Sequence, residues 1–347
     1  MSKPLELPFL NLVRFCRCIG KRPPYSIVYP TLLDERSVGG KKVVALSQDI
    51  TLNLAPTNVF SDNFVLSTAR TTDILHSEFD TSEIRRTLYH DEARMAAVSM
   101  RDDGGVIEVR GVIGEILRIE PLPFLERRAN GQIPHRLFHA RNVNPNDKVT
   151  VSARALATAT AARPSRVHLK HVVVEMFILC DTAFLEFFLT DAEMTDYLAI
   201  TVAAVNLRYK SLQPTIKFSI VGILKLNDVV ENIFMKTNGT YLDAQVTLLN
   251  FMRFTYGGGL READVTYLVT GMDMAEFYRG KVYSQIAGLA YVATLCAYDG
   301  VAIGEDRGAL YFGVDIMAHE LAHSLGCVHD GDGPYQKTCR AQRINKA

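Results

Sequence analysis

The segment His319-Glu-Leu-Ala-His-Ser-Leu-Gly-Cys-Val-His-Asp330 constrains the fold more than any other part of the chain. His319 and His323 are four residues apart, so a helix places both imidazoles on one face, within reach of a single ion. Gly326 permits a left-handed turn that a residue with a Cβ would resist. The chain can reverse there and bring His329 to the same ion. The sequence therefore predicts a helix that ends at a glycine turn and carries a metal site.

The residue types in this segment fit a catalytic zinc site. Three neutral imidazoles leave the fourth position of a tetrahedral Zn²⁺ open for water, and the metal lowers the pKa of that water toward neutrality. Glu320, next to the first ligand, can take the proton and later return it to a leaving amine. We therefore predict a zinc-dependent endopeptidase in which His319, His323 and His329 bind Zn²⁺ and Glu320 is the general base that activates the metal-bound water.

The motif is more specific than a bare His-Glu-x-x-His. Its fixed positions arise together by chance in about one chain in a million of this composition. The alternative interpretation is an amphipathic helix whose histidines are ordinary core or surface residues. His135 and His139 are also four residues apart. They follow Pro134 in an Arg-rich stretch without an acidic neighbour, so we predict no helix and no metal site there.

Composition excludes several other classes of protein. Lys plus Arg is 38 and Asp plus Glu is 38, so the net charge is zero, which argues against a basic chain that coats nucleic acid or an anionic membrane. No apolar run reaches the roughly 18 residues of a membrane span. Hydrophobic residues make up 48% of the chain, which excludes wholesale disorder. Six cysteines in 347 residues do not form a disulfide scaffold, so a hydrophobic core must hold the fold.

The first 24 residues do not form a clear signal peptide. Pro4, Glu6 and Pro8 interrupt the apolar residues that a secretory signal keeps in one unbroken stretch. From these residues alone, the protein either remains inside the cell or lacks its true start in this sequence.

Residues 25–150 are predicted to form a β-rich domain of short strands and turns. Ala96–Met100 and Val106–Val109 flank Asp-Asp-Gly-Gly. Asp and Gly accept the positive φ of a tight turn, so a β-hairpin is predicted there. Lys42–Leu46 and Ile50–Leu54 read as two further extended segments.

Residues 151–166 are predicted to be a linker, because they are small, compositionally biased and lack large apolar anchors. The linker ends in Arg163-Pro-Ser-Arg166. An Arg-x-x-Arg sequence suits a processing protease with basic specificity, and a plain basic loop is an equally good interpretation.

Residues 167–347 alternate strand-like apolar stretches with segments of helical spacing. The clearest helix start is the capping box Thr190-Asp-Ala-Glu193. In chain order we predict a strand over Val172–Leu179, a helix from Thr190 that ends before Pro214, a strand over Thr215–Leu224, a helix opened by Thr240–Asp243, strands over Asp264–Val269 and Gly288–Val292, and a helix over Tyr311–Leu325. This order predicts an α/β fold with a mainly parallel sheet.

The zinc segment resembles the signature of the metzincins, and Asp330 after the third histidine resembles their reprolysin (adamalysin) branch. Gly288–Val292 with Cys296 resembles the edge strand and following cysteine of that family, and Asp264–Gly271 resembles its third strand. The first half, from Ile27–Pro30 through Leu88–Asp91 and Ala96–Ser99, resembles the propeptide of tick salivary reprolysins.

The resemblance implies a secreted, extracellular zinc endopeptidase made as a zymogen. The implied fold is a metzincin-like α/β catalytic domain, with a mainly parallel sheet, an antiparallel edge strand and an active-site helix, preceded by a β-rich propeptide domain. The implied partners are protein or peptide substrates, with extracellular matrix and haemostatic proteins as candidates, and neither nucleic acid nor a membrane span. In the family the edge strand, here around Gly288–Val292, holds an extended peptide.

The chain departs from the family pattern in two ways. The family places a methionine turn beneath the zinc, after the third histidine, whereas the last methionine here is Met317. We therefore expect the catalytic domain, 167–347, to be C-terminally incomplete. Many family propeptides cap the zinc with a cysteine, but none lies between Cys18 and Cys180, so latency would require steric cover. The second hypothesis is therefore a catalytically impaired zinc-binding fragment that acts as a binding protein.

Overall fold

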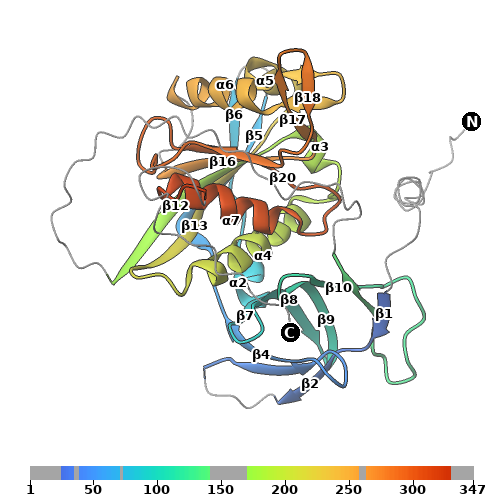
Figure 1. Ribbon diagram of the computed structural model, residues 1–347. Coiled ribbons are helices and arrows are strands. Elements are labelled where there is room, and N and C mark those ends of the chain that lie inside the picture. Colours follow the sequence, from blue (N-terminus) through green and yellow to red (C-terminus); the bar gives the residue numbers. More distant parts are fainter. Residues whose placement is uncertain (1–24, 35–38, 71–72, 141–169, 258–262, 330–347) are drawn as a thin grey trace, which may run out of the picture.

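The computed structural model describes residues 25–34, 39–70, 73–140, 170–257 and 263–329. In this part of the chain the strands form a nine-stranded, a seven-stranded and a four-stranded sheet (Figure 1). The predicted N-terminal segment, linker and Arg166 site lie outside the described residues, as do Asp330 and Cys339. None of the helices described is both long and apolar enough to cross a membrane.

The nine-stranded sheet is antiparallel throughout. The predicted hairpin is present: Asp103 pairs with Val106, and Gly104 and Gly105 between them both have positive φ. The strand order is β1 (Tyr25–Val28), β11 (His135–His139), β10 (Leu117–Pro121), β9 (Val106–Ile113), β8 (Ala96–Asp103), β7 (Leu88–Asp91), β4 (Thr51–Pro56), β3 (Lys42–Ala45) and β2 (Thr31–Asp34).

The seven-stranded sheet is mixed. Its five central strands, from β20 to β5, are parallel, and the strand at each edge is antiparallel to its neighbour. The strand order is β19 (Gly288–Ala290), β20 (Val301–Glu305), β16 (Val265–Thr270), β12 (His171–Cys180), β13 (Thr215–Lys225), β5 (Phe60–Ala69) and β6 (Ile74–Ser77). The chain is therefore α/β, as predicted, and β20 is a central strand that the sequence analysis did not identify.

Residues of the first half complete this second sheet. β5 runs parallel to β13, with Phe60 opposite Ile220 and Thr68 opposite Lys225. The backbone of Ile220 also donates to the carbonyl of Val59 at 2.7 Å. Without β5, one side of β13 would present a row of unpaired backbone groups. The chain segment predicted as a β-rich region of its own therefore contributes two strands to the sheet of the second half.

Helices cover both faces of the seven-stranded sheet. On one face lie α4 (Asp191–Tyr209) and α7 (Gly313–Ser324), and on the other α5 (Asp228–Phe234) and α6 (Ala244–Tyr256) (Figure 1). Because side chains alternate along a strand, Met176 and Ile178 of β12 pack with α4 and α7, while Phe177 and Leu179 pack with α5 and α6. The two short helices are α2 (Ser82–Thr87) and α3 (Thr182–Leu185).

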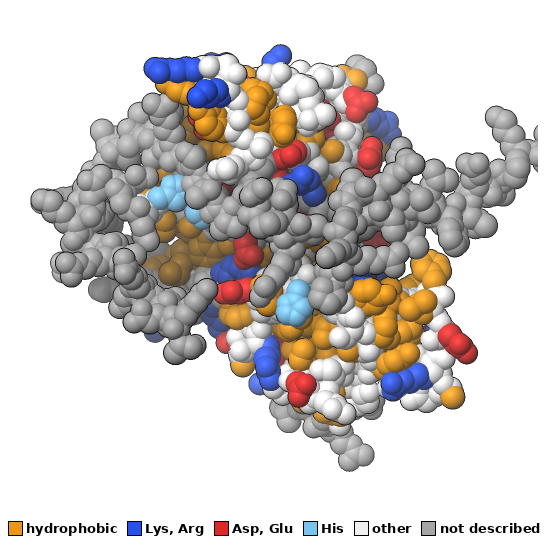
Figure 2. Space-filling model, turned by 45° about the vertical axis from the view of Figure 1, so that its right-hand side comes forward, with side chains coloured by type: hydrophobic (Ala, Val, Ile, Leu, Met, Phe, Trp, Pro, Cys, Tyr) orange, Lys and Arg blue, Asp and Glu red, His pale blue; other side chains and the backbone are white. Residues whose placement is uncertain are grey.

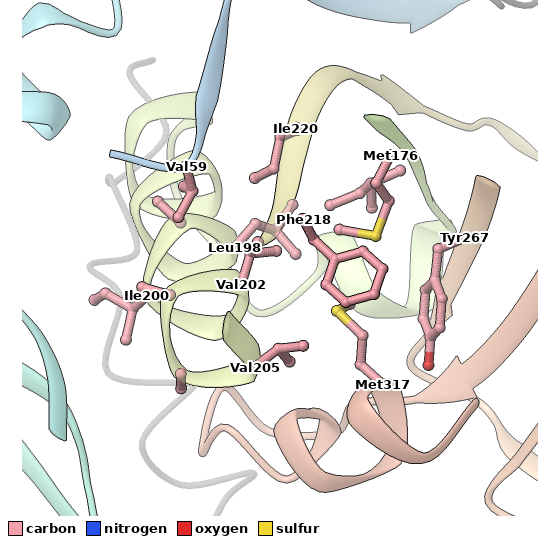
Figure 3. Packing of buried hydrophobic residues seen from close by; sticks show 14 of the residues in the cluster. Val59, Met176, Leu198, Ile200, Val202, Val205, Phe218, Ile220, Tyr267 and Met317 are labelled. Atoms are coloured by element: carbon pink, nitrogen blue, oxygen red, sulfur yellow. The ribbon is translucent and has the colours of Figure 1, made fainter. Parts of the chain in front are cut away.

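The buried residues between α4, α7 and β13 form one continuous core. Figure 3 shows Met317 of α7 beside Phe218 of β13, with Leu198 and Val202 of α4 nearby. The metal-motif helix is therefore packed against the sheet through its apolar face. On the outer surface, charged side chains of both signs are interspersed with apolar ones on the face drawn in Figure 2.

The capping box at the start of α4 is present. The Thr190 hydroxyl accepts from the Glu193 backbone at 3.2 Å, and the Glu193 carboxylate accepts from the Leu189 backbone at 3.0 Å. The next long helix begins directly after the segment Thr240–Asp243 that was predicted to open it. Asp243, rather than Thr240, caps α6 by accepting from the Val246 backbone.

The residues just before α6 are extended because they belong to the small third sheet. Its strands were not predicted from the sequence, since each is short and none has an apolar run of its own. They are β14 (Thr237–Asn238), β15 (Tyr241–Asp243), β17 (Asp273–Tyr278) and β18 (Lys281–Tyr283).

Candidate metal centre

The predicted helix and turn are both present. α7 carries His319 and His323 and ends at Ser324. Gly326 follows with φ of +104°, which supplies the left-handed turn that the motif predicts. The carbonyls at the helix end are satisfied: Gly326 donates to His323 and Cys327 donates to Ala322. This reversal returns the chain toward α7 at His329.

The three histidines converge. The Nε2 atoms of His319 and His323 are 3.0 Å apart, those of His319 and His329 are 3.1 Å apart, and those of His323 and His329 are 3.2 Å apart. Bonds of 2.0–2.1 Å to one tetrahedral zinc would place the nitrogens about 3.3 Å apart. The three donor atoms therefore have the spacing of a shared zinc ion.

The surroundings of His319 and His323 favour neutral imidazoles. The Nδ1 atom of His323 lies 2.8 Å from the carbonyl of Cys327, so Nδ1 carries the proton and Nε2 is left with a free lone pair. Burial, with the two neighbouring imidazoles, lowers the pKa of His319 to about 4. Burial also lowers the pKa of His323 below its ordinary value. Neutral imidazole is the form that binds a metal.

Glu320 is a fully buried carboxylate beside this cluster. Its exposed fraction is 0%, and neither carboxylate oxygen has a hydrogen-bond partner among the described residues. Burial raises the pKa of Glu320 well above its ordinary range. A buried acid without a partner is costly unless a cation, a water molecule or a ligand completes its surroundings. This orphaned carboxylate, together with the donor set, fits a metal-dependent site.

Gly288 makes room for the Glu320 side chain. A Cβ atom at Gly288 would lie 2.6 Å from Glu320 Oε1, which no real side chain tolerates. The edge strand β19 and the carboxylate are therefore in direct contact. The sequence analysis assigned Gly288 only to a strand. Spacing along the chain gave no signal for this contact, because the two residues meet only through the fold.

α4 positions α7 by polar contacts that the sequence analysis missed. Tyr209 donates its hydroxyl to the carbonyl of Ala318 at 2.5 Å, one residue before the first histidine. The Arg208 guanidinium binds the Asp315 carboxylate through Nε at 3.0 Å and Nη2 at 2.5 Å. Periodicity along the predicted helix carries no information on the hydrogen bond of the Tyr209 hydroxyl group.

The second histidine pair, His135 and His139, has a structural role. His135 and His139 lie on strand β11, not on a helix. His135 is buried and its Nε2 accepts from the Val109 backbone at 2.9 Å, while His139 is exposed. Burial lowers the pKa of His135 to about 4. The strand agrees with the prediction that this stretch is not helical, and His135 is a hydrogen-bonded core residue of it.

The Asp264 carboxylate has protein partners on two other segments of the chain. Asp264 accepts from the Glu175 backbone at 2.8 Å and from the Cys296 thiol at 3.1 Å. These contacts tie β12 to the start of β16 and to the loop after β19. Cys180, Cys296 and Cys327 are free thiols within the described part of the chain.

Comparison with known proteins agrees with this site. Residues 195–330 match the family described as metallo-peptidase family M12B, reprolysin-like. The chain is 28% identical to venom metalloproteinase BumaMPs1 of Olivierus martensii, over 89% of this chain and 80% of that protein. It is 26% identical to venom metalloproteinase antarease-like TtrivMP_A of Tityus trivittatus, over 89% of this chain and 79% of that protein.

These similarities confirm the prediction of a metalloendopeptidase, and residues 195–330 are the part of the chain that is similar to the reprolysin-like family. The relatives named here are venom proteins of scorpions, so the likeness to tick proteins in particular stays a prediction. The expected incompleteness of the C-terminal region also stays a prediction.

Proposed function

We propose that this metallopeptidase is a zinc-dependent endopeptidase that hydrolyses peptide bonds in secreted or extracellular proteins. His319, His323 and His329 would hold the zinc ion, and Glu320 would act as the general base. The observation that carries the proposal is the convergence of the three Nε2 atoms to within 3.2 Å of one another. The lone pairs of three ligand nitrogens at this spacing repel one another unless a cation lies between them.

The chemistry divides between the metal and the chain. Zinc, when bound, supplies a Lewis acid that polarises a carbonyl group and makes water more acidic. Glu320 takes a proton from the water that attacks the peptide carbonyl and delivers it to the leaving amine. The burial of Glu320 excludes bulk water and so strengthens electrostatic interactions in the site.

The edge strand supports an extended peptide as the substrate. In the described part of the chain β19 pairs with β20 on one side and has no strand on its other side. A substrate in extended conformation can add to that edge through backbone hydrogen bonds. Because Gly288 of β19 contacts Glu320, a peptide bound along this strand would pass beside the general base.

Secretion and substrate class are further parts of the proposal. The relatives named above are venom proteins, which supports an extracellular protein. Extracellular matrix and haemostatic proteins are the candidate substrates. We also propose that residues 25–150 are a prosegment and that Arg166 is its processing site. In the described residues before 141 there is no cysteine, so such a prosegment would act by covering the site.

A direct experiment compares the full chain with the variant Glu320→Gln. The purified chain should contain one zinc ion and cleave casein or fibrinogen, with loss of cleavage after chelation. Glu320→Gln should keep the zinc and cleave about 10²- to 10⁴-fold more slowly. Absence of zinc, or equal cleavage by both proteins, would refute the proposal. Zinc binding with no cleavage above background in either protein would support the binding-protein hypothesis instead.

A further inference from the structure

The loop before α7 adopts a strained conformation. Tyr311 has φ of +59° and Ala309 has φ of +51°, a region that residues other than glycine rarely occupy. Tyr311 is buried and lies two residues before the first residue of α7. Such a conformation persists only where the surroundings hold it in place.

Contacts from the same half of the chain hold one side of Tyr311. Its backbone N–H donates to the Tyr197 hydroxyl at 2.6 Å, and the two rings stack with centroids 4.2 Å apart. The Tyr197 hydroxyl in turn donates to Asp306 Oδ2 at 2.8 Å. A Cβ at Gly313 would lie 2.6 Å from that same oxygen. Asp306 therefore lies directly against the first residue of α7.

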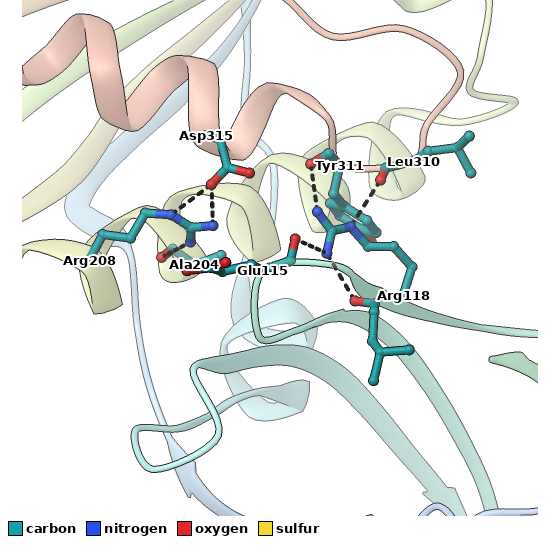
Figure 4. A network of polar contacts seen from close by, with 8 residues as sticks. Glu115, Arg118, Ala204, Arg208, Leu310, Tyr311 and Asp315 are labelled. Atoms are coloured by element: carbon teal, nitrogen blue, oxygen red, sulfur yellow. Dashed lines mark hydrogen bonds and ion pairs between the residues drawn. The ribbon is translucent and has the colours of Figure 1, made fainter. Parts of the chain in front are cut away.

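The other side of the loop is held by Arg118, which belongs to β10 of the nine-stranded sheet. Its Nε donates to the carbonyl of Leu310 at 3.1 Å and its Nη2 to the carbonyl of Tyr311 at 3.4 Å (Figure 4). Its Nη1 donates to the carbonyls of Glu115 and Leu117 in its own sheet. The side chain thus joins the loop before α7 to the first half of the chain.

Arg118 is almost completely buried, with an exposed fraction of 2%. Burial lowers the pKa of Arg118, and the guanidinium still remains charged in proteins. A buried charge of this kind must be well satisfied by its acceptors. Here the acceptors are backbone carbonyls on both sides of the contact, so any shift of the loop would leave donors of a buried cation without partners.

The start of α7 depends on this loop. Phe312, the residue that precedes the helix, makes no side-chain capping bond. The helix start therefore relies on the Asp306, Tyr197 and Arg118 contacts for its position. His319 lies in the second turn of the same helix, and its imidazole moves with any rotation or translation of that helix.

We propose that Arg118 is a positioning residue for the metal centre. By fixing Leu310 and Tyr311 it sets the start of α7, and thereby the place of His319 and His323 relative to His329. Because Arg118 lies in the nine-stranded sheet, the first half of the chain controls the geometry of the metal ligands. The proposal rests on the proposed function in one respect, namely that the three histidines bind zinc.

The experiment measures zinc affinity of the full chain by competition with a chromophoric chelator. Arg118→Ala should raise the Kd for zinc about 2- to 30-fold, the range expected for residues that couple to a site without touching it. Arg118→Lys keeps the charge but cannot reach both carbonyls as a planar fork, so it should raise the Kd by a smaller factor. Co²⁺ absorption should report altered ligand geometry in Arg118→Ala.

Arg136→Ala is the matched control. Arg136 lies on β11, binds Glu120 at 2.5 Å and stands over the ring of Phe138, so its loss disturbs the nine-stranded sheet without removing a hydrogen bond from Arg118 to the loop before α7. Its Kd for zinc should equal that of the unchanged chain. Unchanged zinc affinity in folded Arg118→Ala, or an equal loss in Arg136→Ala, would overturn the proposal.

Hydrogen exchange of α7 without metal separates this inference from the proposed function. Arg118→Ala, or Arg118→Lys if the alanine variant does not fold, should exchange faster over residues 313–324 than Arg136→Ala. If the unchanged chain binds no zinc, the proposed function fails, whereas faster exchange in α7 would still support the positioning role of Arg118. Equal exchange in the two variants would refute that role.

Discussion

Gly288 and Glu320 are in contact with no space for a side chain between them: a Cβ at Gly288 would lie 2.6 Å from Glu320 Oε1. The contact joins the edge strand of the seven-stranded sheet to the helix that carries the metal motif. The location of the general base is therefore set by a glycine on another element.

Gly288→Ala should reduce catalysis while leaving zinc bound. The added methyl group forces the Glu320 carboxylate to move, and a misplacement of about 1 Å costs roughly 100-fold in rate. We expect kcat/KM to fall by about that factor with zinc stoichiometry unchanged. Gly257→Ala is the control, since a Cβ there would lie 3.4 Å from the Arg253 carbonyl oxygen, its nearest neighbour. Full activity in Gly288→Ala would contradict the prediction.

His329→Ala should weaken zinc binding strongly. Structural zinc sites release about 10–16 kcal/mol from four ligands, so one ligand is worth roughly 3 kcal/mol, or about 100-fold in Kd. The comparison is with His139→Ala, which removes an exposed histidine on β11 and should leave the Kd unchanged. Competition with a chelator measures both values. A His329→Ala chain with the original affinity would mean that the third ligand has been misassigned.

Asp181 should make stability depend on pH. It is buried at the start of α3, where it accepts from the Phe184 and Gly271 backbones and from the Thr270 hydroxyl. Burial raises its pKa from 3.8 to about 6. The folded state thus binds the Asp181 proton more tightly than the unfolded state, so its contribution to stability falls as pH rises from about 4 to about 6, and is constant above that range.

The variant Asp181→Asn tests this dependence. The amide does not titrate, so the unfolding free energy of the variant relative to the original chain should rise by about 2 kcal/mol between pH 4 and pH 7. Urea unfolding of both chains with a chelator present, which removes any contribution from bound metal, measures the difference. A difference that stays constant across these pH values would show that Asp181 does not titrate in this range.

The metal centre could be predicted from the sequence because most of it is local. His319 and His323 share one helix, and Gly326 is close enough along the chain to turn His329 back onto it. Gly288 and Arg118 could not be predicted, since they reach the site from distant strands. Their roles depend on tertiary contacts that leave no periodic pattern in the sequence.

In the fold, too, features that are local in the sequence could be predicted and features that depend on distant contacts could not. The strand β12 is an apolar run interrupted by Glu175, and its second half, Met176–Cys180, is buried on both faces, so its pattern was recognisable. The strand β5 mixes exposed and buried residues, so its membership of the second sheet had no local signal. The helix α6 begins at Ala244, after its cap Asp243, because a strand pairing occupies the preceding residues.

The pairing of β5 with β13 predicts that the two halves of the chain stay together after the connection between them is cut. Leu66 of β5 is 1% exposed and packs in the same core as α4 and α7, and Arg118 adds buried hydrogen bonds to the loop before α7. A protease recognition sequence inserted between residues 150 and 166 allows a single cut. After cleavage the two pieces should elute as one particle in gel filtration and separate only in denaturant.

Leu66→Asp places a charge in that core, so the cut variant should separate into two particles under native conditions. If the cut original chain separates at micromolar concentration, the strand pairing is too weak to hold the halves together, and processing alone would expose the edge of β13.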